Sequence, residues 1–344
     1  MDIRLRVHPF GKYCHRQPFA YAPIRRACAD VIKVTDRFED ADVVIVAHFK
    51  DVVAYGETLT RRLKPDQMLV LLSEEPFWDS VWANDPLQRQ NGFQTQAGYL
   101  PFIFLNHYTS RIYEFDHIPY FLLTHTDYTR RYAEWFGRNA LYTHSDWQNH
   151  FKQTALDAVF LSEYRNESRF NVQFPQADII GLSTLRTQIA LMCQLPRKRI
   201  SGTGWQEGFR RQQLDDWHLD KFQTYDRQSC FFSAIENTHQ PDYVSEKIFD
   251  AYAMGAVPLY IAGPQHRARR FVTGNSWVNL WGLTPEMATV AINEFVFDAD
   301  FFAAYRHTQV QLALRFGTPA YLEQEMDRLK AALLGELVAA LNDH

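Results

Sequence analysis

The residues best suited to chemistry lie in the stretch ENTHQPDYVSEKIFDAYAMGAVPLYIAG, residues 236–263. The apolar run Cys230–Ile235 precedes it and predicts a buried strand, and the residues from 243 to 254 predict a helix that Gly255 caps. A polar loop between a strand and a helix is where parallel α/β sheets bind ligands. The exposed N–H groups and partial positive charge of a helix N-terminus favour anions such as phosphate.

Three residues of this predicted helix could share one ligand. Tyr243, Glu246 and Lys247 are spaced i, i+3 and i+4, which would put them on one face of the first turn. Because a lysine there opposes the helix dipole, an external anion is its natural partner, and Glu246 could then accept hydrogen bonds from ligand hydroxyls. The alternative is an ordinary helix start with a first-turn acid and a solvated lysine. These residues alone do not decide between the two.

A second group of chemically capable residues lies in MLVLLSEEPFWDSVW, residues 68–82. The apolar run Met68–Leu72 predicts a buried strand, and Glu74 and Glu75 follow at its carboxyl end. Two acids in such a place are costly unless they are solvated, paired or used. Aromatic residues that could line a sugar site follow at once: Phe77, Trp78 and Trp82. The alternative is a pair of solvated acids above a packed aromatic cluster.

Length, composition and charge of the whole chain restrict the fold and function that these residues can serve. Its 344 residues suggest two domains, and 46% hydrophobic with 22% charged residues is an ordinary globular composition. A net charge of -4 argues against a nucleic-acid partner. The four cysteines show no metal-ligand spacing, and no Asp or His cluster predicts a metal site. Without a signal peptide or a transmembrane segment, we expect a cytoplasmic protein with reduced thiols.

Short apolar runs alternate with helical patterns along the chain, which predicts parallel α/β sheets. We place the boundary between two α/β halves near residues 150–175. The last segment, residues 321–344, has leucines at three- and four-residue spacing and predicts an amphipathic helix. We expect this helix to pack on the protein's own body rather than on a membrane or in a dimer, and the oligomeric state stays open.

The stretch 236–263 resembles the donor-binding signature of glycosyltransferase family 10, the α1,3/α1,4-fucosyltransferases. The family's Glu-Asn-Ser loop stands here as ENT at 236–238, and its Tyr-Val-Thr-Glu-Lys as YVSEK at 243–247. The segment AMGAVP and then GNSWVN, residues 274–279, extend the likeness. By this resemblance the donor GDP-sugar would contact Arg186, Glu236, Asn237, Tyr243, Ser245, Glu246 and Lys247.

The resemblance implies a GT-B fold of two Rossmann-like domains facing a cleft. Residues 1–165 would form the acceptor-binding domain, residues 166–320 the GDP-sugar-binding domain, and residues 321–344 the C-terminal helix. The family's general base is a glutamate in the loop after the strand, which here is Glu74 or Glu75. We place Glu74 first because it comes first after the strand.

The same resemblance implies an inverting transfer of L-fucose from GDP-fucose to a hydroxyl of an acceptor glycan, without a required metal. An α1,3-type linkage to a GlcNAc- or glucose-containing acceptor is expected. A bacterial enzyme acting on an oligosaccharide or lipid-linked glycan such as lipopolysaccharide would suit a cytoplasmic protein with peripheral contact at the inner membrane. Two alternatives remain: another GDP-sugar donor, and a non-catalytic carbohydrate-binding protein.

Overall fold

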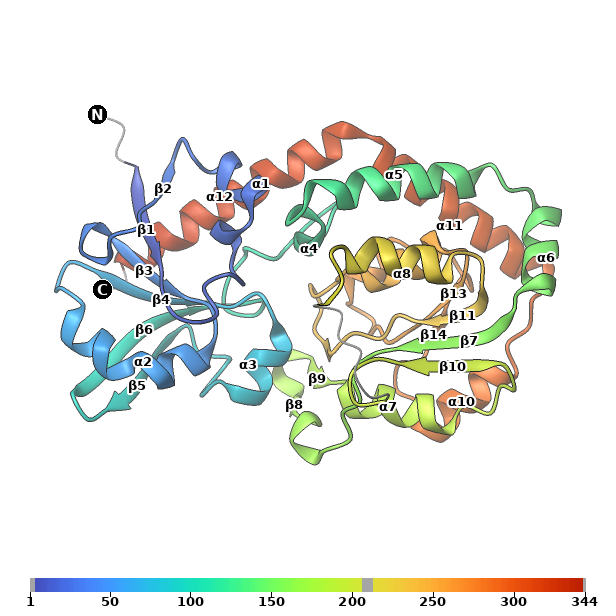
Figure 1. Ribbon diagram of the computed structural model, residues 1–344, viewed down its shortest axis with the longest axis horizontal. Helices are drawn as coiled ribbons and strands as arrows, with labels where there is room; N and C mark the ends of the chain where they lie inside the picture. The colour runs from blue at the N-terminus through green and yellow to red at the C-terminus, as the bar shows by residue number, and fades with distance from the viewer. Residues whose placement is uncertain (1–3, 206–212, 343–344) are drawn as a thin grey trace. The chain divides into compact units, whose positions relative to one another are not determined.

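The chain forms two compact units, each built around a mostly parallel sheet (Figure 1). The computed structural model describes residues 4–205 and 213–342. Unit 1 comprises Met1–Thr126 with Ala320–His344, and unit 2 comprises Asp127–Pro319. The predicted fold class, with two Rossmann-like α/β units and a C-terminal helix, is confirmed.

The sheet of unit 1 has six strands in the order β2-β1-β3-β4-β6-β5. Neighbouring strands are parallel except for β5 and β6. The central strands are buried along their whole length, which explains their continuous apolar sequences. The strands are β1 (Leu5–Pro9), β2 (Ile32–Val34), β3 (Val43–Val46), β4 (Met68–Leu72), β5 (Gln90–Thr95) and β6 (Gly98–Leu105).

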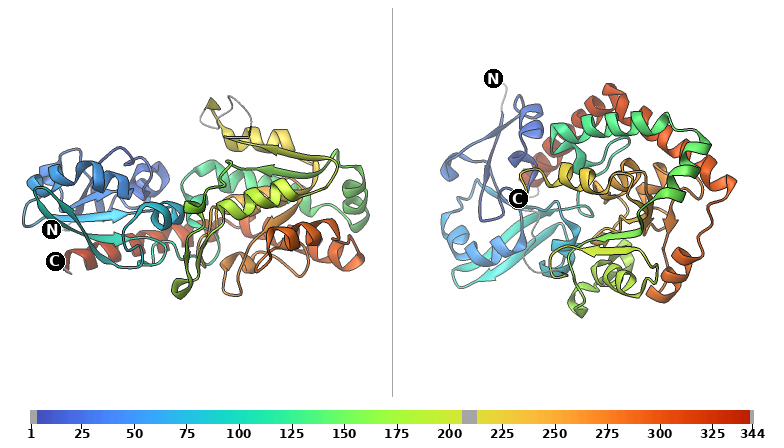
Figure 2. Two further views of the ribbon diagram at one scale, coloured as in Figure 1. Left: turned by 90° about the horizontal axis from the view of Figure 1, so that it is seen from below. Right: turned by 45° about the vertical axis from the view of Figure 1, so that its right-hand side comes forward.

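Four helices of unit 1 precede Thr126 along the chain, and a fifth comes from the end of the chain. The first four are α1 (Ala22–Ala27), α2 (Phe49–Arg62), α3 (Pro76–Trp82) and α4 (Tyr120–Leu123). The last is α12 (Pro319–Asn342), the predicted amphipathic helix. Figure 2 shows its red ribbon beside the blue and cyan strands of this unit. Leu329, Leu333 and Leu337 of α12 are fully buried.

Polar contacts also hold α12 on unit 1. The Glu325 carboxylate accepts hydrogen bonds from the backbone N–H groups of Asp116, His117 and Ile118. Glu336 pairs with Arg89 at 2.6 Å. The helix therefore packs on the protein's own body, as we expected. Within the described part of the chain, the helices lack the combination of length and apolar content needed to cross a bilayer.

The sheet of unit 2 has five parallel strands in the order β10-β7-β11-β13-β14. The chain passes from β7 to β10 on one side and then returns to β11 on the other. The carboxyl ends of β7 and β11 therefore form a topological switch point, where open α/β sheets bind ligands. The strands are β7 (Leu156–Leu161), β10 (Lys198–Ser201), β11 (Ser229–Ser233), β13 (Val257–Tyr260) and β14 (Val278–Asn279).

A small antiparallel sheet and several helices complete unit 2. Its strands, in the order β12-β9-β8, are β8 (Gln173–Phe174), β9 (Ile179–Gly181) and β12 (Thr238–His239). Figure 1 shows α7 and α10 on one side of the main sheet and α8 on the other. The helices are α5 (Thr126–Ala140), α6 (His144–Gln153), α7 (Ser183–Met192), α8 (Trp217–Tyr225), α9 (Lys247–Ala253), α10 (Pro285–Asn293) and α11 (Ala299–Gly317).

The boundary between the units lies earlier in the chain than the sequence-based division at residue 165. Strand β7 pairs with both β10 and β11, so it belongs to the central sheet of unit 2. Helices α5 and α6 precede β7 and lie in the same unit. The polar residues that follow β7 form the loop at the carboxyl end of a central strand.

Candidate active site

The loop after β11 and the start of α9 bring most of the predicted donor residues together in unit 2. Helix α9 begins at Lys247 and has seven residues, so the predicted helix start at 243 is wrong. In a helix beginning at 243 the Lys247 N–H would donate to the Tyr243 carbonyl, but it donates to Ser245 Oγ at 3.4 Å instead. Gly255 ends the helix with φ +75°, as predicted.

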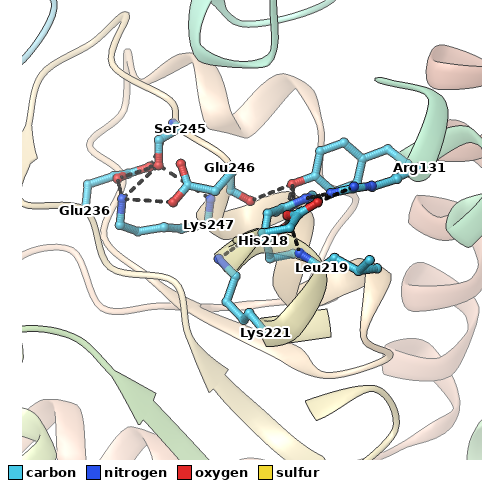
Figure 3. Close-up of polar contacts among 11 residues, drawn as sticks. Arg131, His218, Leu219, Lys221, Glu236, Ser245, Glu246 and Lys247 are labelled. Carbon is cyan, nitrogen blue, oxygen red and sulfur yellow. Dashed lines mark hydrogen bonds and ion pairs between the residues drawn. The ribbon is translucent and has the colours of Figure 1, made fainter. Parts of the chain in front are cut away.

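Glu236 is the buried centre of this cluster (Figure 3). Its carboxylate accepts hydrogen bonds from the Ser245 hydroxyl at 2.8 and 2.9 Å and from Lys247 Nζ at 2.7 Å. Burial raises the pKa of Glu236, and the neighbouring charge of Lys247 opposes that shift. Glu236 and Ser245 thus form an internal support rather than a surface for ligand.

Lys247 and Glu246 are the members of this cluster that reach solvent. Their side chains are 25% and 14% exposed, against 2% for Glu236. Lys247 Nζ also donates to Ser245 Oγ at 2.9 Å and lies 3.7 Å from Glu246 Oε1. The structure therefore gives Lys247 an internal partner, whereas the helix-dipole reasoning had pointed to an external anion. Its ammonium is held in place where an anionic ligand could reach it.

Arg186 on α7 is a buried cation beside the same loop. Only 4% of the residue is exposed, and its Nη1 donates to the Ile235 carbonyl at 3.4 Å. Among the described residues its Nε has no hydrogen-bond partner. Burial and the nearby charge of Arg165 lower the pKa of Arg186 to about 10, so it stays charged at neutral pH. A buried guanidinium with an unused donor suits an anionic ligand.

The two remaining predicted donor residues differ in exposure. Asn237 is half-buried, and its carbonyl accepts a hydrogen bond from the Leu182 N–H at 2.9 Å, just before α7. Tyr243 is 1% exposed, and its N–H closes a turn onto the Gln240 carbonyl at 3.0 Å. Asn237 is therefore the more accessible of the two.

A buried polar network that we did not predict from the sequence lies directly behind Lys247. Asp250 of α9 accepts hydrogen bonds from the Tyr132 hydroxyl at 2.6 Å and from His218 Nε2 at 2.8 Å. It also forms an ion pair with Lys221 of α8 (Figure 3). Burial would raise the pKa of Asp250, but Lys221 and His218 together lower it. The network joins α5, α8 and α9, so it fixes the start of α9.

The Glu74–Glu75 pair lies in unit 1, between β4 and α3. The Glu74 carboxylate accepts hydrogen bonds from Arg16 Nε at 2.6 Å and from the hydroxyls of Tyr21 and Tyr120 at 2.8 and 2.9 Å. Glu74 is fully buried and Glu75 is nearly so. The alternative of two solvated acids is therefore wrong. Glu75 directly precedes α3 and is 7% exposed.

Aromatic side chains gather beside the glutamate pair. Trp78 stacks on His48 with 4.5 Å between ring centroids, and Tyr13 lies 4.5 Å from the same imidazole. Tyr13 and His48 come from the loops after β1 and β3, which form the switch point of this sheet. Trp78 and Trp82 are half-buried and remain candidates for packing on a sugar, but Phe77 is 2% exposed and belongs to the core.

No group of three or more His, Cys, Asp or Glu side chains is arranged to hold a metal ion within residues 4–205 and 213–342. Lys247 and Arg186 are the cationic groups beside the loop after β11 that we consider for a diphosphate. Activity without a required metal stays a prediction.

Comparison with known proteins finds a family model that is similar to part of unit 2. Residues 197–305 match the model described as glycosyltransferase family 10 (fucosyltransferase) C-term. No curated protein matches. A solved α1,3-fucosyltransferase with GDP-fucose is 13% identical at a TM-score of 0.43, with 89% of this chain and 81% of that chain covered. A structure titled as α1,3-fucosyltransferase with GDP is 13% identical at 0.44, with 88% and 81% covered.

At TM-scores of 0.43 and 0.44 the likeness to solved structures supports no conclusion about this chain. The family match is the finding that bears on its function. The matched segment contains the loop after β11 and the start of α9, where most of the predicted donor residues meet. The predicted resemblance and enzyme class are therefore confirmed over this segment: residues 197–305 are similar to the C-terminal part of glycosyltransferase family 10, the fucosyltransferases.

Proposed function

We propose that the protein transfers L-fucose from GDP-fucose to a hydroxyl of an acceptor glycan in one inverting displacement. The proposed acceptor is a bacterial glycan such as lipopolysaccharide, with an α1,3-type linkage to a GlcNAc or glucose residue. The observation that carries this proposal is the half-exposed Lys247 held over the buried Glu236, with the buried Arg186 beside the same loop.

The donor would bind to unit 2 through charge and hydrogen bonds. Lys247 and Arg186 offer fixed positive charge to the diphosphate, whose leaving oxygen gains negative charge as the sugar departs. Glu246 is half-buried and can accept hydrogen bonds from fucose hydroxyls. Asn237 is accessible enough to orient the nucleotide, and the role we proposed for Tyr243 would be a supporting one because it is buried.

The transfer itself makes and breaks one bond to the anomeric carbon. The acceptor oxygen bonds to that carbon while the bond to the β-phosphate oxygen breaks, and GDP leaves with the electron pair. The acceptor proton passes to a carboxylate, a task worth about 10²–10⁴-fold in rate. We propose that this carboxylate belongs to the Glu74–Glu75 pair of unit 1.

Calorimetric titration with GDP-fucose, GDP-mannose and GDP, with and without manganese, tests this function. We expect metal-independent binding of GDP-fucose and GDP, followed by fucosyl transfer to an acceptor in a glycan screen. Tighter binding of GDP-mannose would keep the fold and the chemistry but change the donor. Absence of binding to every GDP compound would refute the proposal.

A further inference from the structure

We propose that Tyr164 and Trp205 form the surface on which the nucleobase of the donor stacks. This inference rests on the proposed function and adds a nucleobase subsite to it. None of the residues that the sequence assigned to the donor offers an exposed aromatic ring, because Tyr243 is 1% exposed. An exposed aromatic ring gives the base of a nucleotide a flat surface to stack on.

The two residues lie at the carboxyl ends of adjacent parallel strands. Tyr164 follows β7, and Trp205 follows β10, its neighbour in the sheet. Strand β7 is one of the two strands at the switch point of unit 2. The rings meet edge to face with centroids 4.9 Å apart, and 41% of Tyr164 is exposed. A large aromatic residue is thus presented to solvent where such sheets bind nucleotides.

Both residues are fixed before any ligand arrives. The Tyr164 N–H donates to the Thr203 carbonyl, and Trp205 Nε1 donates to the Ser162 carbonyl, each at 2.9 Å. Gly202 has φ +126°, and a Cβ atom there would lie 2.3 Å from the Ser162 oxygen. The glycines of the SGTG sequence, residues 201–204, therefore let the loops after β7 and β10 approach each other closely. A preorganised ring loses little entropy on binding.

Cationic groups that suit phosphate are close in the chain to this aromatic pair. Arg165 follows Tyr164 directly, and its N–H donates to Thr187 Oγ1 at 3.2 Å. Thr187 is the neighbour of Arg186, and Arg165 is near enough to lower the pKa of Arg186. The Arg165 guanidinium is paired with Glu163 at 2.6 Å, whereas Nε of the buried Arg186 has no hydrogen-bond partner among the described residues. An exposed ring and a buried cation on neighbouring segments suit a nucleoside diphosphate, which has a flat base and an anionic phosphate chain.

The test compares GDP with inorganic pyrophosphate on the full-length chain. We expect Tyr164→Ala to weaken GDP binding about fivefold or more, since stacking of one base on an aromatic ring is worth about 1–3 kcal/mol. Pyrophosphate has no base, so its affinity should stay at the wild-type value. Tyr164→Phe keeps the ring and should bind GDP like the wild type. Tyr99→Ala removes a tyrosine of unit 1 that is 62% exposed and serves as the matched control.

Three other outcomes would overturn the nucleobase subsite. Wild-type GDP affinity in Tyr164→Ala would overturn the nucleobase subsite and leave the proposed fucosyl transfer intact. Equal losses for GDP and pyrophosphate would also overturn it, because Tyr164 would then support the phosphate site instead. If the wild-type protein binds pyrophosphate but not GDP, the proposed function fails together with this inference.

Discussion

Lys247 Nζ lies 2.7 Å from the carboxylate of Glu236, so a half-exposed cation is held by a buried anion. Ser245 hydrogen-bonds both members of the pair. Because Glu236 is 2% exposed, it acts on a ligand through Lys247 rather than by contact. In the proposed donor site Glu236 is therefore a positioning residue, and we propose that Lys247 is the group that meets the diphosphate.

Replacing Lys247 tests this division of roles. We expect Lys247→Ala to weaken GDP binding about 10- to 100-fold, because a hydrogen bond to a charged group is worth about 1.5–3 kcal/mol. The change also leaves the buried Glu236 without its cation, so Tm should fall most at pH values where Glu236 is ionised. Calorimetry and thermal unfolding measure the two effects.

The double variant Lys247→Ala with Glu236→Gln separates binding from stability. The glutamine removes the unpaired buried charge, so Tm should recover toward the wild-type value while GDP affinity stays low. Recovery of GDP affinity in the double variant would contradict a direct role for Lys247 at the diphosphate.

Single replacements of Glu74 and Glu75 in unit 1 separate catalysis from stability in the same way. Glu74→Gln leaves Arg16 without its carboxylate partner, so we expect a loss of about 3 kcal/mol or more in the free energy of unfolding. Glu75→Gln tests the second acid of the pair separately. Fucosyl transfer per folded molecule should fall by about 10²–10⁴-fold in the variant that removes the base, with GDP binding kept in both. Normal transfer by both variants would show that the base lies elsewhere.

The network behind Lys247 predicts strong coupling between Asp250 and Lys221. Asp250→Leu leaves Lys221 buried without a counter-charge, so the free energy of unfolding should fall by about 3–5 kcal/mol. The double variant with Lys221→Met should lose much less than the sum of the single changes. Urea unfolding measures both, and Glu134→Gln at an exposed ion pair is the control. Additive losses would contradict direct pairing.

Much of the fold can be predicted from the sequence because continuous apolar runs indicate buried strands. The predicted strand at Met68–Leu72 matches β4 residue for residue. The start of α9 was predicted four residues too early, because helical spacing cannot reveal that Glu236 holds Ser245, whose hydroxyl takes the Lys247 N–H. A contact between residues nine positions apart overrides the local preference.

The candidate site was predictable only where its residues share one motif. Glu246 and Lys247 stand together in the chain and were found by their spacing. Asp250 lies three residues further on, but its partners Lys221 and His218 come from α8, which carries no comparable signal. Local sequence patterns cannot show which distant helix will supply a counter-charge.

Two buried histidines of unit 1 predict a loss of stability in acid. Burial lowers the pKa of His107 to about 3, and burial with the nearby Lys50 does the same for His48. Above about pH 6.5 both histidines are neutral in the folded and unfolded chains, and their contribution to stability is complete. As the pH falls from there toward about 3, only the unfolded chain takes up these protons, so the free energy of unfolding decreases.

Urea unfolding between about pH 8 and pH 4 measures this slope. The variant His107→Gln cannot take up the proton, and its amide can still donate to the Glu74 carbonyl, which His107 Nε2 contacts at 3.1 Å. We expect a shallower decrease than in the wild type, since each pKa unit corresponds to about 1.4 kcal/mol. His15→Gln, at an exposed position, is the control. An unchanged slope in His107→Gln would mean that His107 accepts a proton in the folded state, which its burial argues against.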